Sequence, residues 1–258
     1  MTAATIASRF TVAAASFFLL ASASDAAEIT VMISGGYSAA YKEIVPQFEQ
    51  ATGNKVVTIF GPSMGETPEA IPHRIARGEP VDAVIMVGYA VDQLIAQGKV
   101  TQSSRNNLAQ VLIYMAVRAG APKPDISTAE GLKNALLAAK SVGISKGPSG
   151  VYLMKLMDKL GIADQVKAKA VSPDLGVRVG TLVAKGEAEI GVQQVNELLP
   201  IAGIDFVGKL PKELQTVIVY GAARGSNAKE WPAAEALVKY LTSPAAAAIL
   251  KKLGLDPA

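Results

Sequence analysis

Short apolar runs alternate with segments of helical periodicity along most of this 258-residue chain. The β-branched run EITVMI at 28–33 predicts a strand, and the apolar spacing over 34–53 predicts a helix that ends at its final glycine. KVVTIF at 55–60 predicts a second strand, and a short helix is expected over 68–77. The largely apolar run at 81–87 is typical of a strand buried on both faces of a parallel sheet. Strands and helices in this order predict the start of a doubly wound α/β fold.

The same alternation continues to the C-terminus. The related stretches IARGEPVDAVIMVG and LVAKGEAEIGVQQV place Gly78 and Gly186 between a helix and a strand, which favours two similar α/β lobes. Further helices are predicted over 90–98, 128–139, 150–161, 176–186, 231–242 and 244–254, and further strands over 109–120, 141–145, 167–172, 189–195 and 214–224.

The first 27 residues have the pattern of a secretory signal peptide, with Arg9 before an apolar run and small residues before Glu28. An uncleaved membrane anchor is the alternative, but the run is short and no cationic flank follows it. We therefore expect a signal peptide at 1–27 and a soluble protein exported to the periplasm.

Composition narrows the possible functions. Half of the residues are hydrophobic and 18% are charged, so the chain can bury a large core. The net charge of +3 comes from scattered lysines and arginines, and a nucleic-acid-binding surface is not expected. The chain has no cysteine and only one histidine, His73, so we expect neither a metal site nor a cofactor.

The tripeptide Gly-Pro-Ser occurs twice, each time between a predicted strand and a predicted helix. In a parallel α/β sheet, ligands bind beyond the carboxyl ends of the strands, where loops lead into helix N-termini. Free N–H groups and serine hydroxyls favour a small anion there, although a serine at such a corner can equally be an ordinary N-cap. The candidate contacts at these corners are Ser34, Gly35, Gly36, Tyr37, Ser63, Met64, Gly65, Gly88, Lys146, Ser149 and Gly150.

At these residues the chain resembles a known family. The stretches EITVMISGGYSAAYKEIVPQFEQATG, IPHRIARGEPVDAVIMV, GPSGVYLMKLMDKLGIADQVKAKAV, VRVGTLVAKGEAEIGV and ALVKYLTSPAAAAILKKLG are similar, in this order, to the periplasmic molybdate-binding proteins of ABC importers. The resemblance implies a type II periplasmic binding protein, in which two doubly wound α/β lobes joined by two crossing strands close on a ligand. It also implies a monomer that meets an ABC permease in the inner membrane.

The resemblance implies ligand contacts as well, and the chain departs from the family pattern at two of them. Ser63 and Ser149 match small or serine contacts, and Val177 matches a backbone contact. The family's first-loop serine, however, falls on Gly36, and its oxyanion-binding tyrosine falls on Gln194. A tetrahedral dianion would lose two hydroxyl donors here, whereas an amide can hydrogen-bond a larger organic ligand. We therefore expect an organic carboxylate rather than a molybdate-type oxyanion.

Three further polar residues belong to the candidate site. Gln193 could hydrogen-bond an organic ligand, and Lys146 could pair with a carboxylate. Arg178 could point at the same ligand or tie the lobes together. Arg74 and Arg77, by contrast, are expected on a solvated face.

Two functions remain open at this point. We favour a substrate-binding protein of an ABC importer. The alternative is an isomerase, because aconitate isomerase, a periplasmic enzyme, is similar to molybdate-binding proteins. A cleft that holds a polycarboxylate needs only a positioned base to move an allylic proton. The candidate bases are Tyr37, Glu66, His73 and Lys146, and the sequence singles out none of them.

Crossing strands are expected near 111–117 and 216–222. Lobe one then comprises 28–113 and 218–258, and lobe two comprises 114–217.

Overall fold

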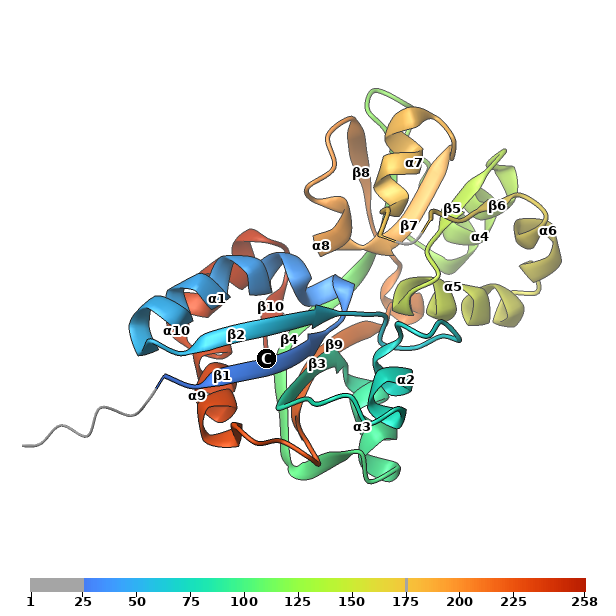
Figure 1. Ribbon diagram of the computed structural model, residues 1–258. Coiled ribbons are helices and arrows are strands. Elements are labelled where there is room, and N and C mark those ends of the chain that lie inside the picture. The colour runs from blue at the N-terminus through green and yellow to red at the C-terminus, as the bar shows by residue number, and fades with distance from the viewer. Residues whose placement is uncertain (1–25, 175) are drawn as a thin grey trace, which may run out of the picture.

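The computed structural model describes residues 26–174 and 176–258, which fold into two α/β lobes (Figure 1). The predicted signal peptide at 1–27 lies almost entirely outside the described residues. The strands form one sheet with the order β2-β1-β3-β9-β4-β7-β5-β6, and β8 and β10 pair with β4 beside this path. The fold class predicted from the sequence is confirmed.

Lobe one contains a parallel set of strands extended by antiparallel partners. β1 pairs in parallel with β2 and with β3, whereas β9 runs antiparallel to both β3 and β4. The strands of this lobe are β1 (Glu28–Ile33), β2 (Lys55–Phe60), β3 (Ala83–Val87), β4 (Val100–Arg118), β9 (Val217–Gly225) and β10 (Asp256–Pro257).

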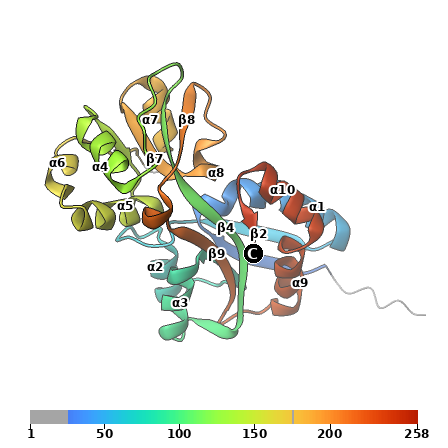
Figure 2. The same cartoon turned by 180° about the vertical axis from the view of Figure 1, so that it is seen from behind.

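The helices of lobe one cover the two sides of this sheet. α1, α9 and α10 contact one another on one side, and α2 and α3 lie on the other (Figures 1 and 2). These elements are η1 (Gly35–Tyr37), α1 (Ser38–Thr52), α2 (Ile71–Ala76), α3 (Gly88–Ala96), α9 (Trp231–Leu241) and α10 (Pro244–Lys252).

Lobe two is built around the second half of β4. β7 and β8 pair antiparallel with β4, and β5 continues the sheet in parallel between β7 and β6. The elements are α4 (Ala129–Ala138), β5 (Val142–Ile144), α5 (Pro148–Lys159), α6 (Ala163–Lys167), β6 (Ala170–Val171), α7 (Val179–Lys185), β7 (Ile190–Gln194), α8 (Val195–Leu198), β8 (Ile204–Lys209) and η2 (Lys212–Leu214).

Two strands connect the lobes, and Figure 2 shows β4 and β9 passing between them. β4 pairs with β9 up to Leu112 and with β7 from Ile113 onward. The return strand β9 begins at Val217, which is the partner of Leu112. The lobe boundaries at 113/114 and 217/218 lie within one residue of this change of pairing and remain our proposal.

The periodicity of the sequence explains most of these elements. All five residues of β3 are buried, as the apolar run predicted, and α1 ends where Gly53 adopts a left-handed φ of 76°. β4 extends back to Val100 through the polar stretch TQSSRNN, which has no strand pattern. The short elements α6, α8 and β8 were also not predicted. They gain their order from packing within lobe two.

One buried carboxylate ties the first strands of lobe one to its C-terminal part. Asp82 is 6% exposed, and its Oδ2 accepts a hydrogen bond from Thr30 N at 2.8 Å. Its Oδ1 accepts from the backbone N–H groups of Lys229 and Glu230 at 2.7 and 2.9 Å, just before α9 begins. The carboxylate therefore satisfies three backbone donors from segments far apart in the sequence.

Among the helices of the described residues, none has the length and apolar character needed to cross a bilayer.

Candidate functional site

The carboxyl ends of β1, β2 and β3 lie side by side. Ser34 N, just past β1, donates to Ile85 O in β3 at 2.9 Å. Ser63 follows β2, and its buried Oγ accepts from Val87 N at the end of β3 at 3.2 Å. Gly88 then begins α3. Parallel pairing thus gathers the first two serine corners and Gly88 at one edge of the lobe-one sheet, and Ser63 keeps its hydroxyl proton free to donate.

The residue after the first Gly-Pro-Ser corner and the proline of the second line one cavity between the lobes. This cavity has a volume of about 660 Å³. Its wall includes Met64 and Gly88 from lobe one and Pro148 from the start of α5 in lobe two. Met64 and Pro148 are the immediate neighbours of Ser63 and Ser149. The cavity therefore lies between the segments that carry the two corners, and Ser63 and Ser149 themselves are not among its lining residues.

The corner that begins α5 is held by contacts of its own. Ser149 is fully buried, and its Oγ lies 3.0 Å from Ser145 Oγ. A β-carbon at Gly150 would collide with the carbonyl oxygen of Ser145, so this glycine is required by the tight approach of the backbone. One proton of the two serine hydroxyls is used in their mutual hydrogen bond, and the other is free to donate.

A second polar cluster connects the end of β7 to the first corner of lobe one. Gln194 Nε2 donates to the hydroxyl of Tyr220 in β9 at 2.6 Å. A β-carbon at Gly36 would collide with this same hydroxyl oxygen. Asn196 Nδ2, in α8, donates across the cleft to Gly36 O at 2.6 Å. The rings of Tyr37 and Tyr220 lie 5.8 Å apart, so one compact cluster joins both lobes.

Three buried side-chain oxygens in and beside this cluster make no hydrogen bond within the described residues. They are Ser34 Oγ, Tyr37 Oη and Asn196 Oδ1. A buried polar atom without a partner is costly, so each of these atoms is a candidate contact for a ligand or a water. Burial raises the pKa of the Tyr37 hydroxyl, which therefore stays protonated and can donate. The Oδ1 atom of Asn196 can only accept.

Gln193 connects the start of α7 to a carboxylate. Its Oε1 accepts from Val179 N at 2.9 Å, and its Nε2 donates to Glu197 Oε2 at 3.1 Å. Burial raises the pKa of the Glu197 carboxyl, and the charge of Arg178 and the Gln193 hydrogen bond oppose that rise. Burial raises the pKa of Tyr220, and the charge of Glu197 adds to this rise, which places the two groups in one electrostatic environment.

Other predicted contacts lie toward solvent. They are Gly35, Gly65, Glu66, Lys146 and Val177, which are all exposed, and no atom lies within 4 Å of the missing β-carbon of Gly35. The His73 ring nitrogen Nε2 lies 3.1 Å from Gly65 O and so supports the loop that follows β2.

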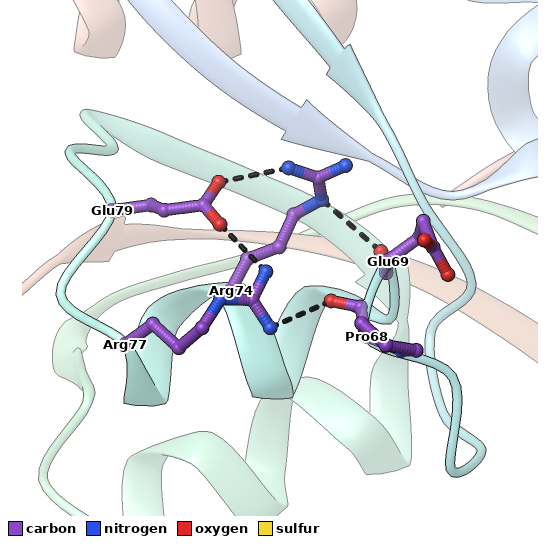
Figure 3. A network of polar contacts seen from close by, with 5 residues as sticks. All are labelled: Pro68, Glu69, Arg74, Arg77 and Glu79. Atoms are coloured by element: carbon purple, nitrogen blue, oxygen red, sulfur yellow. Dashed lines mark hydrogen bonds and ion pairs between the residues drawn. The ribbon is translucent and has the colours of Figure 1, made fainter.

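Two arginines, Arg74 on α2 and Arg77 at its C-terminal cap, hold the loop after β2 in place (Figure 3). Arg74 Nε donates to Glu69 O at 3.2 Å, and Arg77 Nη1 donates to Pro68 O at 2.8 Å. Both guanidinium groups also contact Glu79, at 2.8 and 2.7 Å, and they lower the pKa of its carboxyl. The expectation that these arginines only line a solvated face is incomplete, because they also fix the loop beside the cleft.

Tyr220 and Glu197 did not emerge from the sequence. Tyr220 lies in a predicted strand and carries no local signal, because its contacts with Gly36 and Gln194 come from distant segments. Glu197 lies in α8 and Gln193 in β7, so their contact depends on the turn from this strand into the helix. Neither residue belongs to a recognisable motif.

Comparison with known proteins gives one family and several relatives. A family model described as bacterial extracellular solute-binding protein matches residues 29–256. The chain is 44% identical over 232 residues to a Pseudomonas sp. protein named aconitate isomerase, covering 89% of this chain and 87% of the relative. It is 29% identical over 244 residues to a molybdate-binding protein of Azotobacter vinelandii, covering 92% of each.

A solved structure supports the fold assignment. The periplasmic molybdate-binding protein of Azotobacter vinelandii superposes with a TM-score of 0.69, at 22% identity, covering 88% of this chain and 98% of that one. At this level of identity the similarity establishes the two-lobed fold and leaves the ligand open.

Proposed function

We propose, since this chain belongs to the bacterial extracellular solute-binding protein family, that it captures a small polycarboxylate of the aconitate class between its lobes and interconverts the double-bond isomers. The relative at 44% identity, named aconitate isomerase, moves our preference from a receptor to an enzyme. The organic acid was already favoured over molybdate by Gly36 and Gln194.

The observation that carries this proposal is the chemistry of the three buried oxygens without partners. Ser34 and Tyr37 offer hydroxyl donors, and Asn196 Oδ1 offers only an acceptor. A fully deprotonated tetrahedral oxyanion has acceptors alone and cannot satisfy Asn196. A polycarboxylate with one protonated carboxyl group presents acceptors and one donor, so it complements all three atoms.

The orientation of the Asn196 amide is set by its other contact. Its Nδ2 is 2.6 Å from the carbonyl oxygen of Gly36, which needs a donor. The opposite amide atom must therefore be the carbonyl oxygen, and the acceptor character of the orphan atom follows from the network.

The isomerisation requires a base and a proton return. The base removes a proton from the methylene carbon, the double bond moves by one position, and a proton is delivered to the former vinyl carbon. One C–H bond breaks and one forms, with no change in oxidation state. Glu197 is the base we propose, because burial raises the pKa of its carboxyl and the Gln193 amide orients it. Glu66 and Lys146 are exposed, so neither side chain has the burial that favours a base in a closed site.

The experiment is to incubate purified protein with cis-aconitate in D₂O and to follow the vinyl proton by NMR. We expect trans-aconitate to form with deuterium in the product, because an allylic transfer exchanges a carbon-bound proton with the base. Conversion without any deuterium in the product over many turnovers would contradict the proposed proton transfer. Binding of aconitate without conversion would reject the proposed isomerase activity.

A second candidate, a receptor without turnover, is favoured by the family description itself. It would be a periplasmic monomer that delivers the same organic acid to an ABC permease. A thermal-shift screen with aconitates, citrate, molybdate and sulfate separates the ligand classes, because a bound ligand stabilises the folded state by mass action. Stabilisation by carboxylates without conversion of aconitate identifies the receptor, and stabilisation by oxyanions alone rejects both versions of the proposal.

A further inference from the structure

Arg105 has a fixed position at the edge of the interlobe cavity. It lies where the pairing of β4 with β9 shifts register, between Thr101 and Asn106. Its Nε donates to Asp92 at 3.2 Å, and its Nη1 donates to Asn107 Oδ1 at 2.6 Å. Its Nη2 makes no hydrogen bond to any residue that the structure describes. The guanidinium group thus has two anchored nitrogens and one free nitrogen at the cavity wall.

Two glycines make room for this guanidinium group. A β-carbon at Gly88 would lie 2.8 Å from Arg105 Nη2, and one at Gly221 would lie 2.5 Å from Nη1. A side chain at either position would displace the arginine. The side chain of Arg105 is 19% exposed, whereas that of Asp92 is 62% exposed. An ion pair to so exposed a carboxylate is weak and leaves most of the arginine's charge available to a ligand.

Lys155 brings a second cation to the same cavity from the other lobe. It lies on α5, about two turns after Pro148, and both residues line the cavity with Arg105. The salt bridges within the described residues do not include Lys155. A carboxylate that enters the cavity would therefore meet one cation from each lobe.

We infer that Arg105 and Lys155 form a carboxylate-binding site in the interlobe cavity, which binds the third carboxylate of a tricarboxylate ligand. This inference rests on the proposed polycarboxylate function and specifies how the number of carboxylates is recognised. Arg105 gives directional hydrogen bonds through its held guanidinium, and Lys155 adds a mobile charge when the lobes close.

The test measures the dissociation constant of tricarballylate, a saturated tricarboxylate that cannot isomerise, by calorimetry. The variants are Arg105→Gln and Lys155→Gln, and Lys159→Gln is the matched control because it removes an exposed lysine one turn further along α5. We expect each cavity variant to weaken binding about tenfold, as is typical for the loss of a charged hydrogen bond, with Lys159→Gln unchanged. Glutarate, which has one carboxylate fewer, should be less affected by the same variants.

The outcomes separate this inference from the proposed function. If the wild-type protein binds no polycarboxylate, both ideas are rejected. If it binds tricarballylate and both cavity variants bind it equally well, the Arg105–Lys155 site is rejected and the proposed function stands. Circular dichroism checks the fold of Arg105→Gln. If Arg105→Gln does not fold, the affinity of Lys155→Gln alone tests the site, because Lys155 is exposed and forms no salt bridge within the described residues.

Discussion

Gly36 lies against the hydroxyl oxygen of Tyr220 so closely that a side chain at position 36 has no space. The family resemblance places a ligand-binding serine at this position, and in this chain the tyrosine hydroxyl occupies the volume that such a side chain would take. Gln194, which stands where the resemblance implies a tyrosine, donates to that hydroxyl. Gly36, Gln194 and Tyr220 therefore form one set of contacts at the place where the resemblance implies ligand donors.

Gly36→Ala should destabilise the protein and impair ligand binding. The new methyl group must displace Tyr220 or the η1 turn, and overpacking of this kind costs about 1–3 kcal/mol of the free energy of unfolding. Gly35→Ala is the matched control, because no atom lies within 4 Å of its missing β-carbon. Urea unfolding of both variants gives the measurement, and equal stabilities would show that Tyr220 can move without cost.

Asn196→Ala should weaken ligand binding by opening the contact between the lobes. The variant loses the hydrogen bond to Gly36 O and the acceptor that we assign to the ligand, each worth about 1 kcal/mol. Calorimetry should show a loss of affinity of about tenfold or more, and small-angle scattering should show a smaller compaction on ligand addition. Asn134→Ala on the exposed face of α4 is the control and should bind as the wild type does.

Glu197→Gln should abolish isomerisation while ligand binding persists. The wild-type kcat/KM should fall as the pH drops through the Glu197 pKa, which burial places above the usual glutamate range, because only the carboxylate accepts the substrate proton. A pH–rate profile of the wild type and single-turnover assays of the variant test this. An active Glu197→Gln enzyme would transfer the role of base to another residue.

The same carboxyl should make stability depend on pH in a defined direction. A folded-state pKa above the unfolded value means that the folded protein holds this proton more tightly, so the stabilisation is complete below about pH 4.3 and is lost as the pH rises through the folded-state value. Glu197→Gln, which mimics the protonated form, should therefore be more stable than the wild type at pH 8. This difference should shrink toward acidic pH. Thermal unfolding of both proteins across this range provides the measurement, and Glu187→Gln at an exposed site should show no such trend.

Asp82→Ala should be among the more destabilising single substitutions in lobe one. It leaves three backbone N–H groups without their acceptor, at about 1 kcal/mol each, so we expect a loss of about 3 kcal/mol in chemical denaturation. Asp158→Ala removes an exposed carboxylate whose ion pair with Lys167 spans 3.6 Å and should change stability by less than about 0.5 kcal/mol. Similar losses in the two variants would mean that the Asp82 network contributes little.

Local patterns determined the secondary structure and the place of the site along the chain. Neighbouring residues are enough to predict the apolar strand β3, the glycine that ends α1 and the two Gly-Pro-Ser corners. Burial produces a characteristic spacing of apolar residues, and glycine and proline mark the ends of elements. The ends of parallel strands necessarily share one edge, so the grouping of Ser34, Ser63 and Gly88 could be anticipated. The short strand β8 and the polar first half of β4 could not, because pairing with neighbouring strands orders them.

By itself, the sequence determined that this is an α/β chain with two lobes and with serines at several of its strand ends. Only the tertiary structure decided which distant side chains meet there. The contacts of Tyr220 with Gly36, of Glu197 with Gln193 beside Arg178, and of Arg105 with the cavity depend on strand register and on the shift in β4. These are long-range geometric relations, and no short window of residues encodes them.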